Sequence, residues 1–156
     1  MRRLPGIVAV SALLAACNSH APVAAPQPSD PVPLFAGLGD RAPRDAQRAF
    51  LAARASVPAS GFFGNDSQAD LLAVAEDVLE GEILYREGEK EAAFAALRRA
   101  AAREDTLHYD EPPGWILPVR HALGALLLDA GRPEEAEAVF HEDLARLPDN
   151  GWSLYG

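Results

Sequence analysis

Apolar and polar positions follow the period of an α-helix along most of the chain after residue 44. In the segment 67–87, one face collects Leu71, Leu72, Ala75, Val78, Leu79, Ile83 and Leu84. Similar apolar stripes run through 44–57, 89–103, 117–130 and 133–147. No segment combines strand-like alternation with turn residues. The pattern therefore predicts an all-α fold built from five main helices with these boundaries.

Start and stop signals divide this region into two helical hairpins that follow a single helix. Ser67, with Asp70 three residues later, is typical of a capping box at the start of a helix. Glycines at 88 and 131 interrupt the apolar pattern between the paired helices. Pro133 is suited to the first position of the last helix, and Pro148 ends it.

The two predicted hairpins carry small and bulky residues at the same spacing. The shared positions are Gly81, Gly88, Ala93 and Leu97 in the first hairpin, and Gly124, Gly131, Ala136 and Phe140 in the second. A small residue lets the paired helix approach closely, and a glycine makes the turn. A small and then a bulky residue let the second helix interlock with the first.

These residues, together with Pro148, resemble the tetratricopeptide repeat (TPR), a helix–turn–helix unit of about 34 residues. The resemblance covers residues 44 to 156 and implies a short solenoid of about two and a half repeats. Neither first helix carries the family's usual early tryptophan. The chain also resembles a bacterial set of such proteins in which a Tyr–acid–acid–Pro–Pro–x–Trp loop joins two repeats, and this likeness implies architecture only.

Both ends of the repeat region match partial repeats. Residues 46–58 resemble the second half of a unit, and Trp152, Tyr155 and Gly156 resemble the start of another. Solenoid repeats bury a face only against a neighbour, so terminal units need a polar cap. Trp152, Leu154 and Tyr155 are poor caps. We therefore expect an incomplete C-terminal edge, which a longer chain or a second molecule would cover.

The first residues have the pattern of a secretory signal. Arg2 and Arg3 precede a short apolar run that ends at residue 16 and falls well short of the roughly 20 residues that a membrane span needs. The end of this run, Leu14-Ala15-Ala16-Cys17, resembles the lipobox of bacterial lipoproteins. That resemblance implies a signal peptide over 1–16 and a lipid on Cys17. The alternative is an ordinary cleaved signal with an incidental cysteine.

Residues 17–43 are rich in proline and alanine and predict an extended tether between the lipid and the helices. Asn18, a residue other than Asp, follows the cysteine, which in Gram-negative lipoproteins implies the outer membrane. The anchored chain would then face the periplasm of the bacterial envelope. A lipid anchor attaches a protein without spanning the bilayer.

Composition narrows the range of functions. The chain has 156 residues and a formal charge of −9, so it lacks the basic surface that nucleic-acid binding requires. Aromatic residues make up only 7% of a chain that is 49% hydrophobic, which favours packed helices. Its one cysteine excludes an internal disulfide framework and a thiolate metal cluster. We expect no cofactor.

The stretch LHYDEPPGW, residues 107–115, lies between the two hairpins and holds most of the residues capable of chemistry. A metal site at His108, Asp110 and Glu111 would need further converging donors, so an acidic loop is the favoured interpretation. We expect Trp115 to pack against the helices. Tyr109, Asp110 and Glu111, together with His121, are the candidate partner-binding residues, and the two acids are expected to be exposed.

Two classes of function follow from this pattern. The first is a membrane-anchored scaffold that binds a protein or peptide in the envelope and is not an enzyme. It accounts for the repeats and for the lack of a nucleophile elbow or a phosphate-binding loop. The alternative is an envelope enzyme, or an accessory subunit of one, that uses the 107–115 loop.

Overall fold

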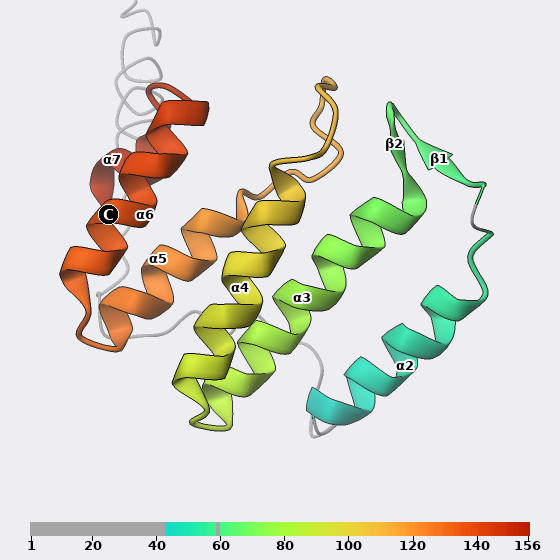
Figure 1. The fold of residues 1–156 in the computed structure, drawn as a ribbon, viewed down its shortest axis with the longest axis horizontal. Coiled ribbons are helices and arrows are strands. Elements are labelled where there is room, and N and C mark those ends of the chain that lie inside the picture. Colours follow the sequence, from blue (N-terminus) through green and yellow to red (C-terminus); the bar gives the residue numbers. More distant parts are fainter. Residues whose placement is uncertain (1–42, 59) are drawn as a thin grey trace, which may run out of the picture. The chain divides into compact units, whose positions relative to one another are not determined.

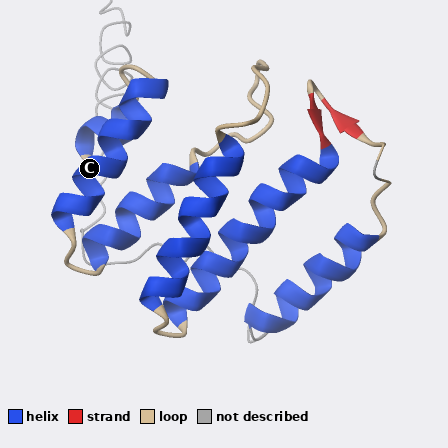
Figure 2. Cartoon of the chain, in the orientation of Figure 1, coloured by secondary structure: helices blue, strands red, loops and turns tan. Residues whose placement is uncertain are grey.

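The computed structural model describes residues 43–58 and 60–156. Figures 1 and 2 show helices α2 (Pro43–Ala55), α3 (Gln68–Arg86), α4 (Lys90–Glu104), α5 (Val119–Asp129), α6 (Pro133–Arg146) and α7 (Gly151–Tyr155). The described part is therefore mostly helical, which confirms the all-α prediction, and all five predicted helices occur close to their expected boundaries. The predicted signal peptide, Cys17 and the tether up to residue 42 lie outside the described residues.

Local signals position the helix ends. The Ser67 hydroxyl accepts a hydrogen bond from the Asp70 N–H at the start of α3, as the capping box predicts. Pro133 occupies the first turn of α6. The helix predicted to start at residue 117 begins at Val119 instead, because Pro118 occupies the N-cap position with an extended backbone.

The structure contains two features that the apolar pattern did not predict, a strand hairpin and a short C-terminal helix. Strands β1 (Phe62–Phe63) and β2 (Asp66–Ser67) form a small antiparallel hairpin before α3, with Phe63 opposite Asp66. Strands of two residues are too short to show alternation, which explains why the pattern misses them. Helix α7 is a short turn of helix, capped by the Asn150 side chain, which accepts from the Trp152 N–H.

Each helix packs against its neighbour in sequence, and the chain reverses direction at each connection (Figure 1). The contacts between α4 and α5 join the two hairpins into one core. Its members are Val74, Phe94, Leu97, Ala100, Ala101, Val119, Leu123, Leu127, Ala136, Val139 and Phe140. Helix α2 has no fully buried residue and joins α3 through ion pairs, among them Arg44 with Glu80 at 2.8 Å.

The two hairpins turn in the same way. Gly88 and Gly131 have φ angles of +88° and +73°, in the left-handed region that glycine adopts readily. In the first turn the Glu89 N–H donates to the Leu84 carbonyl, and in the second the Arg132 N–H donates to the Leu127 carbonyl, both at 2.9 Å. Equivalent bonds 43 residues apart make the two turns local copies of one structure.

Two glycines allow the paired helices to approach. A Cβ added at Gly81 would lie 2.7 Å from Cγ of Leu97, and one added at Gly124 would lie 2.4 Å from Cζ of Phe140. Ala93 and Ala136, one turn before these bulky residues, are fully buried. Gly81 and Gly124 thus make equivalent close contacts, with Leu97 in the first hairpin and Phe140 in the second. Among the helices that the structure describes, none has the combination of length and hydropathy that a membrane span requires.

Candidate functional site

The connection between α4 and α5, residues 105–118, borders a hollow of about 500 Å³, here called the loop hollow. Its lining comes from the loop and from the ends of three helices: Glu104, Leu107, His108, Tyr109, Asp110, Glu111, Pro113, Gly114, Trp115, Ile116, Pro118, Arg120, Asp143, Arg146 and Leu147. Three of the four predicted partner-binding residues, Tyr109, Asp110 and Glu111, are in this set. The fourth, His121, is not.

The β1–β2 hairpin holds the loop in place. Asn65 donates its backbone N–H to Oδ2 of Asp110 at 3.0 Å and its side-chain amide to the Tyr109 carbonyl at 2.9 Å. Next to it, buried Asp66 accepts from the His108 N–H at 2.8 Å. The prediction that Asp110 is exposed is therefore wrong. Its carboxylate is half-buried and binds a loop 45 residues earlier in the chain.

Apolar side chains stand exposed around the loop hollow. Tyr109 is 79% exposed and Ile116 is 73% exposed, and Leu147 on the α6 side is 45% exposed. Glu111 is exposed, as predicted, and accepts a hydrogen bond from the Tyr109 hydroxyl, which raises the pKa of that hydroxyl. Large apolar groups gathered around a concavity are typical of an interaction surface.

Trp115 links this surface to the interior. Its ring is half-buried and packs against the hydrophobic core, as expected for a residue that covers the seam between the two hairpins. The indole Nε1 is buried and has no hydrogen-bond partner among the described residues. A buried donor without an acceptor carries a desolvation cost, so the apolar contacts of the ring must outweigh it.

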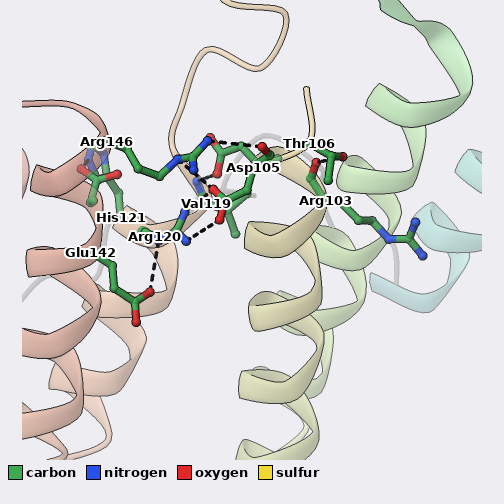
Figure 3. A network of polar contacts seen from close by, with 10 residues as sticks. Arg103, Asp105, Thr106, Val119, Arg120, His121, Glu142 and Arg146 are labelled. Atoms are coloured by element: carbon green, nitrogen blue, oxygen red, sulfur yellow. Dashed lines mark hydrogen bonds and ion pairs between the residues drawn. The ribbon is translucent and has the colours of Figure 1, made fainter. Parts of the chain in front are cut away.

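Asp105, the first residue after α4, is the centre of the polar network in Figure 3. Its two carboxylate oxygens accept from Nη1 and Nη2 of Arg120 at 2.7 and 2.8 Å, and Nε of Arg146 lies 3.0 Å from Oδ1. These arginines, Arg120 first, lower the Asp105 pKa, and the carboxylate raises the Arg120 pKa. The network ties the end of α4 to α5 and α6. Sequence reasoning missed it, although Arg120 interrupts the apolar face of its helix.

Glu104 is the acid next to this network, at the end of α4. Its Oε2 accepts from the Val119 N–H at 2.9 Å and so caps α5, whose N-cap residue, Pro118, provides no side-chain hydrogen bond. Among the described residues, its other oxygen, Oε1, has no hydrogen-bond partner. Burial raises the Glu104 pKa to about 7, because desolvation disfavours the carboxylate more than the Val119 N–H and Arg120 favour it.

His121 binds within its own chain instead of facing a partner. Its Nε2 lies 3.1 Å from Oδ2 of Asp143, and the Asn150 amide lies 3.0 Å from the same oxygen. The Ser153 hydroxyl donates to that oxygen at 2.6 Å. Asp143 is only 2% exposed, so this cluster is a buried joint that fixes α7 to α5 and α6. The prediction that His121 is available to a partner is corrected accordingly.

Acidic groups dominate the charge that remains free on the surface. Every arginine of residues 43–58 and 60–156 forms an ion pair with a carboxylate of the chain. Lys90 lies over the Tyr85 ring at 5.3 Å. By contrast, the exposed acids Glu89, Glu134 and Asp149 have no ion-pair partner within the described residues.

The described residues bring together no group of three or more histidine, cysteine, aspartate or glutamate side chains suited to a metal ion. Comparisons of the chain with protein-family models, with curated proteins and with solved structures found no match.

Proposed function

We propose that this chain is a membrane-anchored, TPR-like scaffold that binds a protein or peptide partner in the bacterial envelope. On this proposal it acts by binding and is not an enzyme. The observation that carries the proposal is the loop hollow, about 500 Å³ in volume, with Tyr109 and Ile116 exposed at its edge. Concave, largely apolar sites with a few polar groups are the usual form of a binding site.

The matching geometry of the two hairpins supports the TPR-like part of the proposal. Their turns, their close-approach glycines and their interlocking residues are all offset by 43 residues. A period of about 34 residues plus the loop accounts for that offset. Repeat proteins of this kind commonly bind partners along the surface that the stacked units create.

The proposed anchor is a lipid on Cys17, and the proposed location is the periplasmic face of the outer membrane. The Leu14-Ala15-Ala16-Cys17 sequence behind a basic and apolar start supports both. Intact mass of the membrane-extracted protein tests the anchor, with a Cys17→Ser variant as the control. We expect a mature chain that starts at residue 17 and carries diacylglycerol, and an unmodified Cys17 would refute the anchor.

Site-specific photo-crosslinking in cells tests the binding surface. A photoreactive residue replaces Ile116 at the loop hollow or, as a matched control, Phe62, which is 69% exposed and does not line the hollow. We expect a discrete crosslinked partner from position 116 and none from position 62. Equal labelling at both positions, or no adduct at 116, would contradict binding at the loop hollow.

A further inference from the structure

We propose that the loop hollow receives a lysine or arginine side chain of the bound peptide, with Glu104 as its counter-ion and apolar neighbours of that side chain against Ile116 and Leu147. This inference rests on the proposed function and specifies the chemistry of the partner. It follows from which charges around the hollow are already neutralised, and from the apolar groups at its edge.

The positive groups of the hollow are committed to acids of the chain. Arg120 makes a bidentate pair with Asp105, and Arg146 lies against the same carboxylate. Asp105 offsets the positive charge of both guanidinium groups, and four further carboxylates belong to the lining: Glu104, Asp110, Glu111 and Asp143. An anionic ligand would be repelled by this excess of acids, so the hollow does not favour a phosphate or a carboxylate.

The negative groups of the hollow differ in how far their oxygens are occupied by hydrogen bonds within the chain. Asp143 is almost fully buried, and its Oδ2 contacts three polar side chains, those of His121, Asn150 and Ser153. Glu104, by contrast, uses one oxygen on the Val119 N–H and leaves Oε1 without a partner among the described residues. A cationic group in the hollow would give that oxygen a donor, and a charge-assisted hydrogen bond is stronger than a neutral one.

The edge of the hollow suits the rest of such a side chain. Lysine and arginine bury an aliphatic stem along apolar surface while the charged end meets a polar group. Tyr109, 79% exposed, offers an aromatic face for the cation, and Ile116 and Leu147 offer apolar surface for adjacent residues. The arrangement fits a peptide in which apolar residues flank one basic residue.

Proton release provides a signature of this contact. Three charged side chains and one backbone donor act on Glu104: Asp105 after its own helix, Arg120 and the Val119 N–H on α5, and Asp143 on α6. The other titratable or charged residues of the lining are His108, Asp110, Glu111 and Arg146. The Glu104 pKa is about 7 in the unliganded chain. A bound cation favours the carboxylate, so binding near neutral pH displaces the proton from Glu104.

The test uses four synthetic peptide libraries with acetylated and amidated ends. Each has leucine and valine on either side of one fixed position, which is Lys, Arg, Gln or Glu, and mixed residues elsewhere. Affinity for the mature lipidated chain in detergent is measured by fluorescence anisotropy. We expect the Lys and Arg libraries to bind at least tenfold more tightly than the Gln library, and the Glu library to bind least.

The outcomes separate the two proposals. No binding of any library, together with no crosslinked partner at position 116, overturns the proposed function. Binding of the Gln library as tight as that of the Lys library overturns the basic side chain and leaves a peptide-binding hollow. If the Lys library still binds the Ile116→Asp variant, the peptide lies elsewhere on the chain, which overturns both the basic side-chain site and binding at the loop hollow.

Glu104→Gln is the decisive variant, because its amide oxygen can still accept from the Val119 N–H. Glu134→Gln is the matched control, an exposed acid of α6 outside the loop hollow. We expect Glu104→Gln to reduce affinity for the Lys library about tenfold, and the control to change it less than twofold. For the wild type, affinity should fall about tenfold per pH unit below pH 7, one proton being displaced. A pH dependence that persists in Glu104→Gln would overturn the assignment of Glu104.

Discussion

Replacing Asp105 with asparagine should destabilise the chain by about 2 kcal/mol. The Arg120 side chain is only 11% exposed and has its two strongest hydrogen bonds to Asp105. Breaking a buried ion pair typically costs about 3–5 kcal/mol, because the remaining charge stays in a poorly solvated position. The lower figure reflects the 26% exposure of Asp105 and the second partner of Arg120, Glu142, whose Oε2 is 3.4 Å from Nε.

Urea unfolding followed by circular dichroism at pH 7 measures this loss, and thermal unfolding should show a decrease in Tm of roughly 8 °C. Glu142→Gln is the control: its side chain is 64% exposed, so the change should stay below about 0.5 kcal/mol. A second variant, Asp105→Asn with Arg120→Met, removes both charges and should recover part of the loss.

The pH dependence of the difference in unfolding free energy between the wild type and Asp105→Asn provides a further check. Arg120 and Arg146 lower the Asp105 pKa in the folded chain below its ordinary value of 3.8. The carboxylate therefore stabilises the fold fully above that ordinary value, and its contribution is lost as pH falls through the lowered folded pKa. A wild type and an Asp105→Asn variant that unfold at the same urea concentration at pH 7 would refute the central role of Asp105.

Three further changes have defined expectations. Burial raises the Glu104 pKa to about 7, above its ordinary 4.5, so the contribution of Glu104 to the free energy of unfolding is full below pH 4.5 and is lost as pH rises through 7. Relative to Glu104→Gln, wild-type stability should therefore decrease by about 1–2 kcal/mol from pH 4.5 to 8, measured by urea unfolding. Gly124→Ala places a Cβ 2.4 Å from the Phe140 ring and should lower stability by about 1–2 kcal/mol, whereas Gly151→Ala, with open space around it, should be nearly neutral in the same assay. Trp115→Ala should cost about 2 kcal/mol because its ring is half-buried, and a variant that melts like the wild type would contradict its structural role.

The helices and the hairpin turns could be predicted because they depend on local spacing. Apolar residues at helical period, the Ser67 cap and glycines at 88 and 131 are each readable within a few positions. The α5 boundary moved by two residues because Pro118 stays extended. The β1–β2 hairpin was not predictable in this way, since its strands have two residues each.

The site was predicted only in part because its key contacts are long-range. The sequence marked the loop and its aromatic residues, yet Asp110 was expected to be free and instead accepts from Asn65. His121 was expected to face a partner and instead lies against buried Asp143. Neither partner is near in sequence, so no local pattern identifies the pair. The Asp105 network did leave a signal in the sequence. Arg120 lies on a buried helix face, and a buried charged residue needs an acid nearby.

Every described arginine is paired with an acid of the chain, and this pairing has a consequence for binding kinetics. Association and dissociation of a partner should depend on different parts of the surface. These ion pairs neutralise the described arginines locally, and the net charge of the chain is −9, so long-range attraction should favour the basic partner proposed above. Association should therefore slow as salt increases. In the proposed complex, dissociation would depend on short-range contacts at the exposed Tyr109 and Ile116, so truncating these side chains should shorten the residence time and leave the association rate nearly unchanged.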